Sequence, residues 1–310
     1  MDPLTQTLQL LRPRALTWKE AECAGDWALR FPAISGVTFT LVAKGSCRLE
    51  LPGRAPLPLT EGDFVLMTAP PVWTLSDGAA TAVTDGRIGH LGVDRFSARV
   101  GRQDGEASTR LVGGHFSFEA ANAGLLAGLL PPIVQIGSMD AGAARLKRLL
   151  DLIDDEAFAD RPGRSLVLER LLETMLVEVI RHGATCAAEP RRGLLAGLAD
   201  PQIARVLQAM HGDVRRNWTV AELATAAGAS RSTFAARFMR VVGAAPIDYL
   251  LSWRMALAKD ALRRGEARLS EVAFASGYQS TSAFSTAFSR IVGCPPARYA
   301  SQARVVAPKF

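Results

Sequence analysis

The sequence predicts an α+β protein of two domains, a β-rich N-terminal domain followed by an all-helical one. Two observations indicate this division. Short apolar segments separated by Gly and Pro fill residues 1–120, which is typical of a sandwich or a small barrel. Residues 219–249 and 270–299 then give nearly the same pattern twice, each with the order helix, Gly turn, helix. With 310 residues, the chain can give each domain its own core.

The composition argues against several classes of protein. No apolar run reaches the roughly 18–20 residues of a membrane span, and the opening MDPLTQTLQLLRPRAL lacks the basic region and apolar core of a secretion signal. The four cysteines lie far apart with no CxxC pair, which argues against a structural zinc site and a disulfide framework. We therefore expect a cytoplasmic protein without membrane contact.

The N-terminal domain reads as a series of strands. Residues 39–53, FTLVAKGSCRLELPG, alternate apolar residues before a Pro-Gly turn, and residues 55–71 return as APLPLTEGDFVLMTAPP. In this return, Glu61-Gly62-Asp63 supplies a tight turn. The segment IVQI at 133–136 is the last predicted strand. The pattern favours a β-barrel or sandwich.

Two helices are predicted to close this domain. Residues 143–158 repeat apolar positions at helical spacing, and a second helix begins with Ser165 as its N-cap. The second helix carries an apolar stripe that either packs in the core or serves dimerisation. We expect residues 1–182 to form the first domain. The stripe contains Leu168, Leu171, Leu172, Met175 and Val179.

The second domain is expected over residues 200–310, after a linker at 183–199 that is rich in Gly and Ala. Asp200-Pro201 opens its first helix, with Asp as N-cap and Pro at the first helical position. From residue 196 onward the chain has 15 Lys and Arg against 7 Asp and Glu, whereas the preceding part has 21 against 23. Excess positive charge of this kind is the electrostatic footprint of a nucleic-acid-binding module.

The two repeats share their local signals. Thr219-x-x-Glu222 is a capping box, Gly228 allows a sharp turn, and Ser230 caps the second helix. Gly277 and Ser280 take the same places in the second repeat. The second helices are predicted to turn four aromatic side chains inward, namely Phe234, Phe238, Phe284 and Phe288.

The outward sides of these second helices are candidates for the major groove of double-stranded DNA. There, side chains read base edges while Arg and Lys hold phosphates. Both outward faces carry small and hydroxylated residues, which predicts modest readout for each contact and strong salt dependence. The candidate DNA-binding residues are Ser230, Arg231, Ser232, Ala236, Arg237, Arg240, Gln279, Ser280, Ser282, Ser285, Thr286 and Arg290.

A helix of about 18 residues is predicted between the repeats, within residues 247–266. At 1.5 Å per residue it is roughly 27 Å long. It could hold two recognition helices about one DNA turn (~34 Å) apart. One chain would then read two successive segments of the major groove.

The C-terminal repeat resembles the signature of the AraC/XylS family of bacterial transcription regulators. The segment EVAFASGYQSTSAFSTAFSRIVGCPPARY carries the resemblance, which extends over the whole C-terminal domain. One departure is Thr286, at a position where many members carry an Arg that contacts DNA. The resemblance implies a sequence-specific transcription regulator that binds as a homodimer, with RNA polymerase as a further candidate partner.

The N-terminal domain is similar to the cupin-type sensing domains of one branch of this family. The segments LVAKGSCRLEL, LTEGDFVLM, TLSDG and GGHFSF carry that resemblance. It implies a β-barrel pocket, a helical dimerisation segment and an unknown small-molecule effector that activates or represses. The candidate pocket residues are Phe39, Leu41, Trp73, Leu75 and His90, although the apolar ones could equally fill the barrel.

Neither metal binding nor redox sensing is expected of this domain. Cupin metal sites use clustered His and a Glu, but only His90 and His115 lie in the β-rich part of this domain and they are isolated. Trp73 takes a loop position where a His is common in related sequences. Acidic neighbours are expected to raise the pKa of Cys23, which favours a structural role for this thiol and for Cys47. No cofactor is therefore predicted.

Two other functions stay open at this point. A cupin enzyme fused to a DNA-binding module would need the missing His and Glu cluster. An architectural DNA binder with a signal-blind N-terminal domain would bind random and promoter DNA almost equally. The prediction that we favour is a regulator that acts by binding and has no enzymatic turnover.

Overall fold

The chain folds into two units in a computed structural model. The β unit comprises residues 13–118 and 130–186, and the helical unit comprises residues 1–12, 119–129 and 187–310. The first helix thus belongs to the same unit as the C-terminal helices. The structure describes residues 2–79, 82–86, 96–118, 129–140, 143–159, 161–185, 192–265 and 267–306, together with Asn122 and Leu125.

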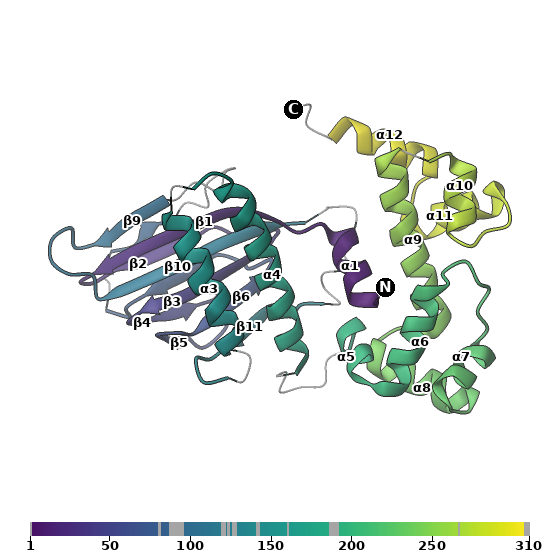
Figure 1. The fold of residues 1–310 in the computed structure, drawn as a ribbon, viewed down its shortest axis with the longest axis horizontal. Helices are drawn as coiled ribbons and strands as arrows, with labels where there is room; N and C mark the ends of the chain where they lie inside the picture. The colour runs from purple at the N-terminus through teal and green to yellow at the C-terminus, as the bar shows by residue number, and fades with distance from the viewer. Residues whose placement is uncertain are drawn as a thin grey trace. The chain divides into compact units, whose positions relative to one another are not determined.

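The β unit contains two sheets among the described residues (Figure 1). The larger has the strand order β11-β6-β3-β10-β1-β9, and the smaller has the order β5-β4-β7-β2-β8. Most neighbours are antiparallel, but β9 pairs with β1 and β8 pairs with β2 in parallel. The strands are β1 (Arg14–Ala24), β2 (Ala28–Phe31), β3 (Val37–Lys44), β4 (Ser46–Glu50), β5 (Leu57–Thr60), β6 (Phe64–Thr68), β7 (Trp73–Ser76), β8 (Thr84–Asp85), β9 (Phe96–Gly101), β10 (Thr109–Ser117) and β11 (Ile133–Ile136).

The sheets face each other and do not close into a barrel. β3 and β4 follow each other in the sequence but belong to different sheets, with Gly45 at the corner between them. Gly45 has a φ of +80°, and a Cβ there would collide with the carbonyl oxygen of Ser108, so only glycine fits. β4 pairs with β5 as a hairpin, and the predicted turn at Glu61-Gly62-Asp63 carries the chain from β5 into the other sheet. The predicted barrel is therefore an open arrangement of two sheets.

Helices α3 (Ala143–Phe158) and α4 (Arg164–Thr185) lie across the larger sheet (Figure 1). Four residues of the predicted stripe of α4 are buried within the β unit, with Leu168, Leu172, Met175 and Val179 at most 1% exposed, while Leu171 is half-buried. Core packing, one of its two predicted roles, is thus the one that the stripe fulfils. A dimer would have to use other residues of these helices.

Two boundaries differ from the sequence prediction. Ser165 is not an N-cap, because α4 already begins at Arg164, after a turn in which Gly163 has a φ of +84°. The segment 183–199, expected to be a linker, contains the end of α4 and the short helix α5 (Leu194–Ala199). α5 packs on α6 and α8, so residues 194–199 are structured, whereas residues 186–191 lie outside the described residues.

The helical unit is built around α9 (Pro246–Arg264), which contacts helices of both repeats. The N-terminal helix α1 (Pro3–Leu11) packs on α6 and α9, and Leu10 joins a cluster with Trp253 and Ala256. The expected domain of residues 1–182 therefore differs from the β unit at its start. No described helix is both long and apolar enough to cross a bilayer. The remaining helices are α6 (Pro201–Gly212), α7 (Val220–Ala227), α8 (Arg231–Val242), α10 (Leu269–Ala275), α11 (Thr281–Val292) and α12 (Pro296–Val306).

Candidate functional site

The first repeat forms a helix-turn-helix unit from α7 and α8. The Thr219 hydroxyl accepts from the backbone N–H of Glu222, and the Glu222 carboxylate accepts from the backbone N–H of Thr219 at 2.8 Å, which is the predicted capping box. Hydrogen bonds from Arg216 and Thr219 lower the pKa of Glu222 to about 2. Gly228 makes the turn with a φ of +68°, and the Ser230 hydroxyl caps α8. Local hydrogen bonds thus fix both ends of the turn.

The second repeat forms the same unit from α10 and α11. Glu271 accepts from the backbone N–H of Arg268 at 2.7 Å, where the first unit has its capping box. Gly277 turns with a φ of +81°, and the Ser280 hydroxyl accepts from the backbone N–H of Ala283. α8 and α11 are each 12 residues long and end on a left-handed glycine.

Matching aromatic contacts hold the two second helices in place. Phe238 meets Tyr249 edge-on, with ring centroids 5.8 Å apart, and Phe288 meets Tyr299 in the same way at 5.5 Å. The four predicted inward phenylalanines are at most 1% exposed. Because their inward sides are fixed in this way, α8 and α11 present corresponding residues to solvent.

Most of the predicted DNA-binding residues are exposed. Ser285 is half-buried, and Arg237 is a correction to the prediction, because its guanidinium binds the carboxylate of Asp200 with both contacts at 2.8 Å. Asp200 in turn caps α6, so Arg237 connects α8 to α6 and its charge is already paired with a carboxylate. The exposed candidates are Ser230, Arg231, Ser232, Ala236, Arg240, Gln279, Ser280, Ser282, Thr286 and Arg290.

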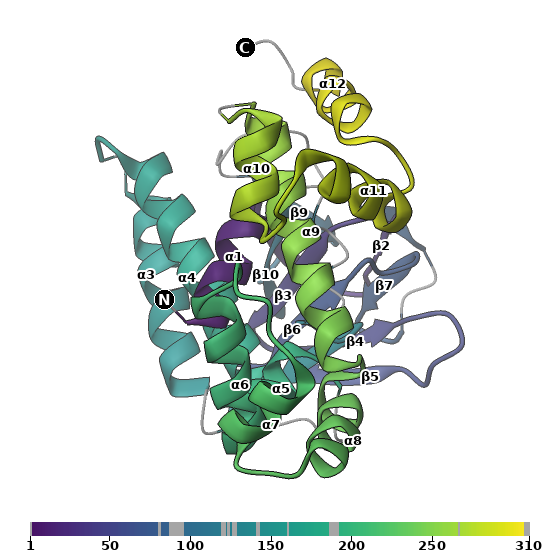
Figure 2. The same cartoon turned by 90° about the vertical axis from the view of Figure 1, so that its right-hand side faces the viewer.

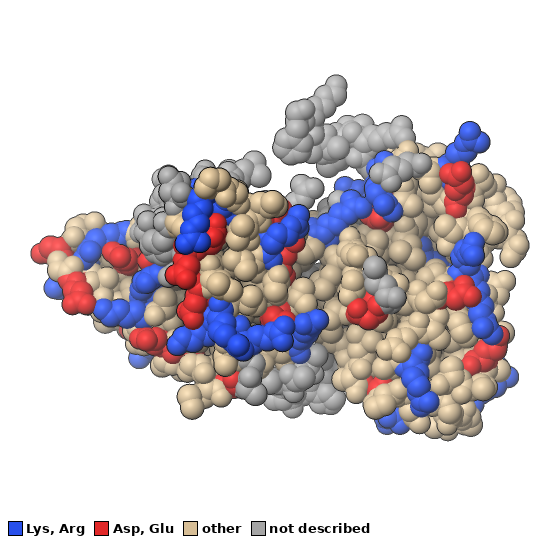
Figure 3. Space-filling model, viewed as in Figure 1, with Lys and Arg blue, Asp and Glu red and all other residues tan. Residues whose placement is uncertain are grey.

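Arg240 and Arg290 occupy equivalent places in the last turns of α8 and α11. Neither forms an ion pair with a carboxylate in the described part of the chain. On the face shown in Figure 3, the basic side chains of the helical unit are scattered among uncharged and acidic ones. Such a surface suits several separate phosphate contacts better than one continuous basic patch.

The spacing between the units comes from α9, whose 19 residues correspond to roughly 28 Å. Figures 1 and 2 show α8 near one end of α9 and α11 near the other. Arg254 of α9 is 7% exposed and donates to the carbonyl oxygens of Val214 and Arg216 at 2.9 and 2.8 Å. These bonds fix the loop before α7 against α9. The helix predicted between the repeats is thus α9, the rod that joins the two helix-turn-helix units.

The structure adds one group of residues that the sequence analysis did not select. Arg215 and Arg216 line a surface depression together with Gln279, and the Arg215 guanidinium lies 5.1 Å from the ring centre of Phe274. Arg215, which precedes the first helix-turn-helix, thus lies near the start of α11 in the second helix-turn-helix. In the sequence, the only sign of this group was the adjacent basic pair Arg215 and Arg216 before the capping box.

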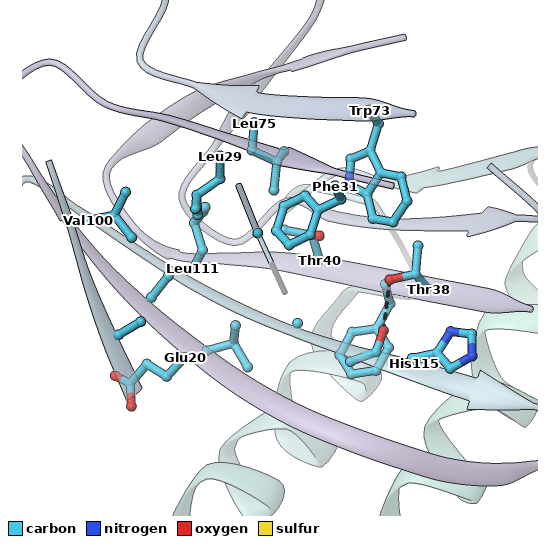
Figure 4. A pocket seen from close by; sticks show the side chains of 17 residues that line it. Glu20, Leu29, Phe31, Thr38, Thr40, Trp73, Leu75, Val100, Leu111 and His115 are labelled. Carbon is cyan, nitrogen blue, oxygen red and sulfur yellow. Dashed lines mark hydrogen bonds between the residues drawn. The ribbon is translucent and has the colours of Figure 1, made fainter. Parts of the chain in front are cut away.

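The β unit contains a cavity of about 120 Å³ between its sheets, shown in Figure 4. Three of the predicted pocket residues line it, Phe39 from β3 and both Trp73 and Leu75 from β7. Leu41 does not line it, and His90 lies outside the described residues. Trp73 belongs to a strand, not to the loop in which it was expected.

Phe39 borders the cavity, but its ring packs elsewhere. The ring lies 5.7 Å from those of Phe64 and Phe116, while its neighbours Thr38 and Thr40 line the cavity. Successive side chains of a strand point to opposite faces, so Phe39 and Leu41 belong to the face away from the cavity interior. Of the two residues predicted on β3, Phe39 therefore borders the cavity and Leu41 does not, and the prediction missed Thr38 and Thr40.

Within the described residues, no three His, Cys, Asp or Glu side chains are arranged to hold a metal ion. Burial lowers the pKa of His115. Burial, with smaller contributions from Cys47 and Asp77, raises the pKa of Cys23 to about 12, and burial together with Asp63 does the same for Cys47. The expected rise in the pKa of Cys23 is thus caused mainly by burial, rather than by the acidic neighbours along the sequence.

Comparisons with known proteins match both units. A cupin family model matches residues 2–184, and a helix-turn-helix domain model matches residues 223–302. A putative AraC-like transcription regulator of Streptomyces lividans is 41% identical over 300 residues, which is 96% of this chain and 98% of that protein. A protein of the same description from Streptomyces antibioticus is 39% identical with the same coverage.

Among solved structures, the chain is similar to the DNA-binding domain of AdpA, a global transcriptional factor, in complex with a target DNA. The identity is 32%, the TM-score is 0.34, and the match covers 36% of this chain and 99% of that one. The assignment of the chain to a family rests on the two matching family models and on the two Streptomyces relatives. With a cupin domain before its paired helix-turn-helix units, the chain belongs to the AraC-like transcription regulators.

Proposed function

We propose that this regulator binds double-stranded DNA by placing α8 and α11 in two successive segments of the major groove. The observation that carries the proposal is the exposure of equivalent residues on two helices held by one rod. Ser232 and Ala236 of α8 correspond to Ser282 and Thr286 of α11, and all four are exposed. Hydroxyl and methyl groups of this kind suit contacts with base edges and with thymine methyls.

The arginines supply the phosphate contacts in this proposal. Arg231, Arg240 and Arg290 are exposed and make no ion pair within the described residues, so their charge is available to DNA. Gln279 lies just before the cap of α11, beside Arg215. These two residues extend the proposed DNA-binding surface between the two helix-turn-helix repeats. Because most of this affinity is electrostatic, binding falls steeply with salt.

A homodimer is the form that we propose for the complete regulator, acting in the cytoplasm and recruiting or blocking RNA polymerase. Three apolar side chains of α3 and α4 support it, because Leu152, Leu166 and Val167 are 53%, 58% and 41% exposed. Exposed large apolar side chains such as these are available to a protein interface. The β unit would then combine dimerisation with sensing of a small-molecule effector in its cavity.

The experiment that tests this function maps the bound sites across the genome and then measures binding to one of them. The affinity for the mapped promoter site is compared with that for a scrambled duplex of the same length at the same salt concentration. We expect a preference on the order of 10³ or more. Nearly equal affinities would favour an architectural DNA binder instead.

A further inference from the structure

We propose that the cavity of the β unit binds a small, uncharged aromatic molecule that carries one hydrogen-bond acceptor, received by the indole nitrogen of Trp73. This inference deepens the proposed sensing function and depends on it for its biological role. The binding itself is a property of the β unit alone, because every cavity residue lies within that unit.

The size and lining of the cavity set the first limits on its ligand. Its volume of about 120 Å³ is close to that of apolar protein cavities (~150 Å³) that accept benzene. Apolar side chains from both sheets surround it, and Figure 4 shows several of them around the space beside Trp73. A ligand of about one substituted ring therefore fits. The main apolar contacts come from Leu29, Phe31, Leu75, Val100 and Leu111.

Trp73 supplies the specific polar contact. Its side chain is 3% exposed, and its indole N–H has no hydrogen-bond partner among the described residues. Leaving such a buried donor unpaired is unfavourable, and a carbonyl oxygen on a ligand would pair it. The Trp73 ring stacks on Phe31, with centroids 5.0 Å apart and planes 15° from parallel. A flat aromatic ligand is the shape best matched to this pair.

The charged groups at the cavity argue against an ionic ligand. No described lining residue is Lys or Arg. Glu20 is 6% exposed and already paired with Arg110 at 2.6 Å, and burial keeps His115 neutral near pH 7 by lowering its pKa. A carboxylate entering the cavity would be buried without a counter-charge and close to Glu20, which is strongly unfavourable.

Two side chains that line the cavity have a buried polar atom without a partner among the described residues, namely the indole nitrogen of Trp73 and Nδ1 of His115. The Thr38 hydroxyl donates to the carbonyl oxygen of Gly114 at 2.9 Å and therefore has no proton to offer a ligand. A second buried tryptophan, Trp27, also has an unpartnered indole N–H, but it does not line the cavity. It is 1% exposed and packs in the same core, so it provides a matched control.

The test uses isothermal titration calorimetry on the full chain with three probes of similar size. Acetophenone carries the acceptor, ethylbenzene lacks it, and benzoate adds a negative charge. We expect acetophenone to bind about 3- to 10-fold more tightly than ethylbenzene, and benzoate not to bind. Trp73→Phe should bring the ratio of the acetophenone affinity to the ethylbenzene affinity down to about one, because both probes feel the change in cavity shape but only acetophenone loses a hydrogen bond.

Trp27→Phe is the control, because it removes an equivalent buried N–H away from the cavity. It should leave all three affinities unchanged, and thermal melting checks that both variants fold. The inference is overturned if acetophenone does not bind, if benzoate binds as well as acetophenone, or if both variants lose affinity equally. DNA binding by the unliganded chain is measured in parallel, so a failure here is distinguishable from a failure of the proposed DNA-binding function.

Discussion

The imidazole of His211 and the phenol of Tyr249 share a hydrogen bond of 2.7 Å between Nε2 and the hydroxyl. Nδ1 of the same imidazole lies 3.0 Å from the side-chain oxygen of Gln6 in α1, and Trp253 stacks on the ring at 4.3 Å. With the Gln6 oxygen accepting from Nδ1–H and the Tyr249 hydroxyl donating to Nε2, the ring is neutral. His211 thus joins α1, α6 and α9 inside the helical unit.

Acid is expected to destabilise this unit through His211. Burial lowers the pKa of His211 from about 6.5 to about 4, so its contribution is fully present above pH 6.5 and is lost as the pH falls towards 4. The shift corresponds to a loss on the order of 3 kcal/mol in the free energy of unfolding. Urea unfolding at pH 7, 5.5 and 4, followed by far-UV circular dichroism, should show this loss in the native chain and a smaller one in His211→Gln.

Glu222→Gln is the control for this measurement. The pKa of Glu222 is lowered from 4.5 to about 2, so its contribution is present above pH 4.5 and is lost only below that value. The two residues therefore act in different pH ranges. A loss between pH 6.5 and 4 that is equally large in His211→Gln would show that other groups cause it.

Replacing either exposed arginine of the recognition helices should weaken DNA binding irrespective of sequence. Arg240→Ala and Arg290→Ala each remove one positive charge that we place on a phosphate. The slope of log K against log[salt] should become shallower by about one unit for each substitution. Fluorescence anisotropy with the mapped site and with a scrambled duplex, at four salt concentrations, measures both effects.

Arg237→Ala provides the contrast, because Arg237 lies in the same helix but is bound to Asp200. It should lower the melting temperature and leave the salt slope within error of the native value. If Arg240→Ala and Arg237→Ala gave the same slope, the assignment of Arg240 to a phosphate would be wrong.

The helix caps of the repeats could be predicted from the sequence because they depend on local hydrogen bonds. Thr219 with Glu222, Ser230 and Ser280 each cap a helix within three residues of their own position, as predicted. The buried phenylalanines followed in the same way from a spacing of four residues along one helix. These features need no information from distant parts of the chain.

The features that the sequence did not predict depend on contacts between distant segments. Arg237 was selected for DNA because it is an arginine near an exposed face, but its partner Asp200 lies 37 residues earlier. Likewise, α1 joins the helical unit through the ion pair of Arg12 with Asp260, 3.0 Å long. On β3, an apolar pattern could not show that Thr40 lines a cavity while Leu41 does not.

The buried thiols of the β unit should resist oxidation in the folded protein. Burial raises the pKa of Cys23 and Cys47 to about 12, and the thiolate is the reactive form. After mild peroxide treatment, peptide mass spectrometry should find both unmodified, whereas the half-buried Cys294 should be the first of the three to react. Modification of Cys23 before Cys294 would revive a redox-sensing function for the β unit.

Changing the distance between the two DNA subsites should separate the contributions of α8 and α11. The rod α9 holds these helices at a fixed spacing, so five extra base pairs between the subsites would turn the second one to the opposite side of the duplex. The affinity should then fall to that of a duplex with one subsite. Replacing the same spacer by another sequence of equal length should preserve it, because the spacer only sets the rotation. Anisotropy titrations compare these duplexes, and an unchanged affinity after the insertion would show that only one helix contacts DNA.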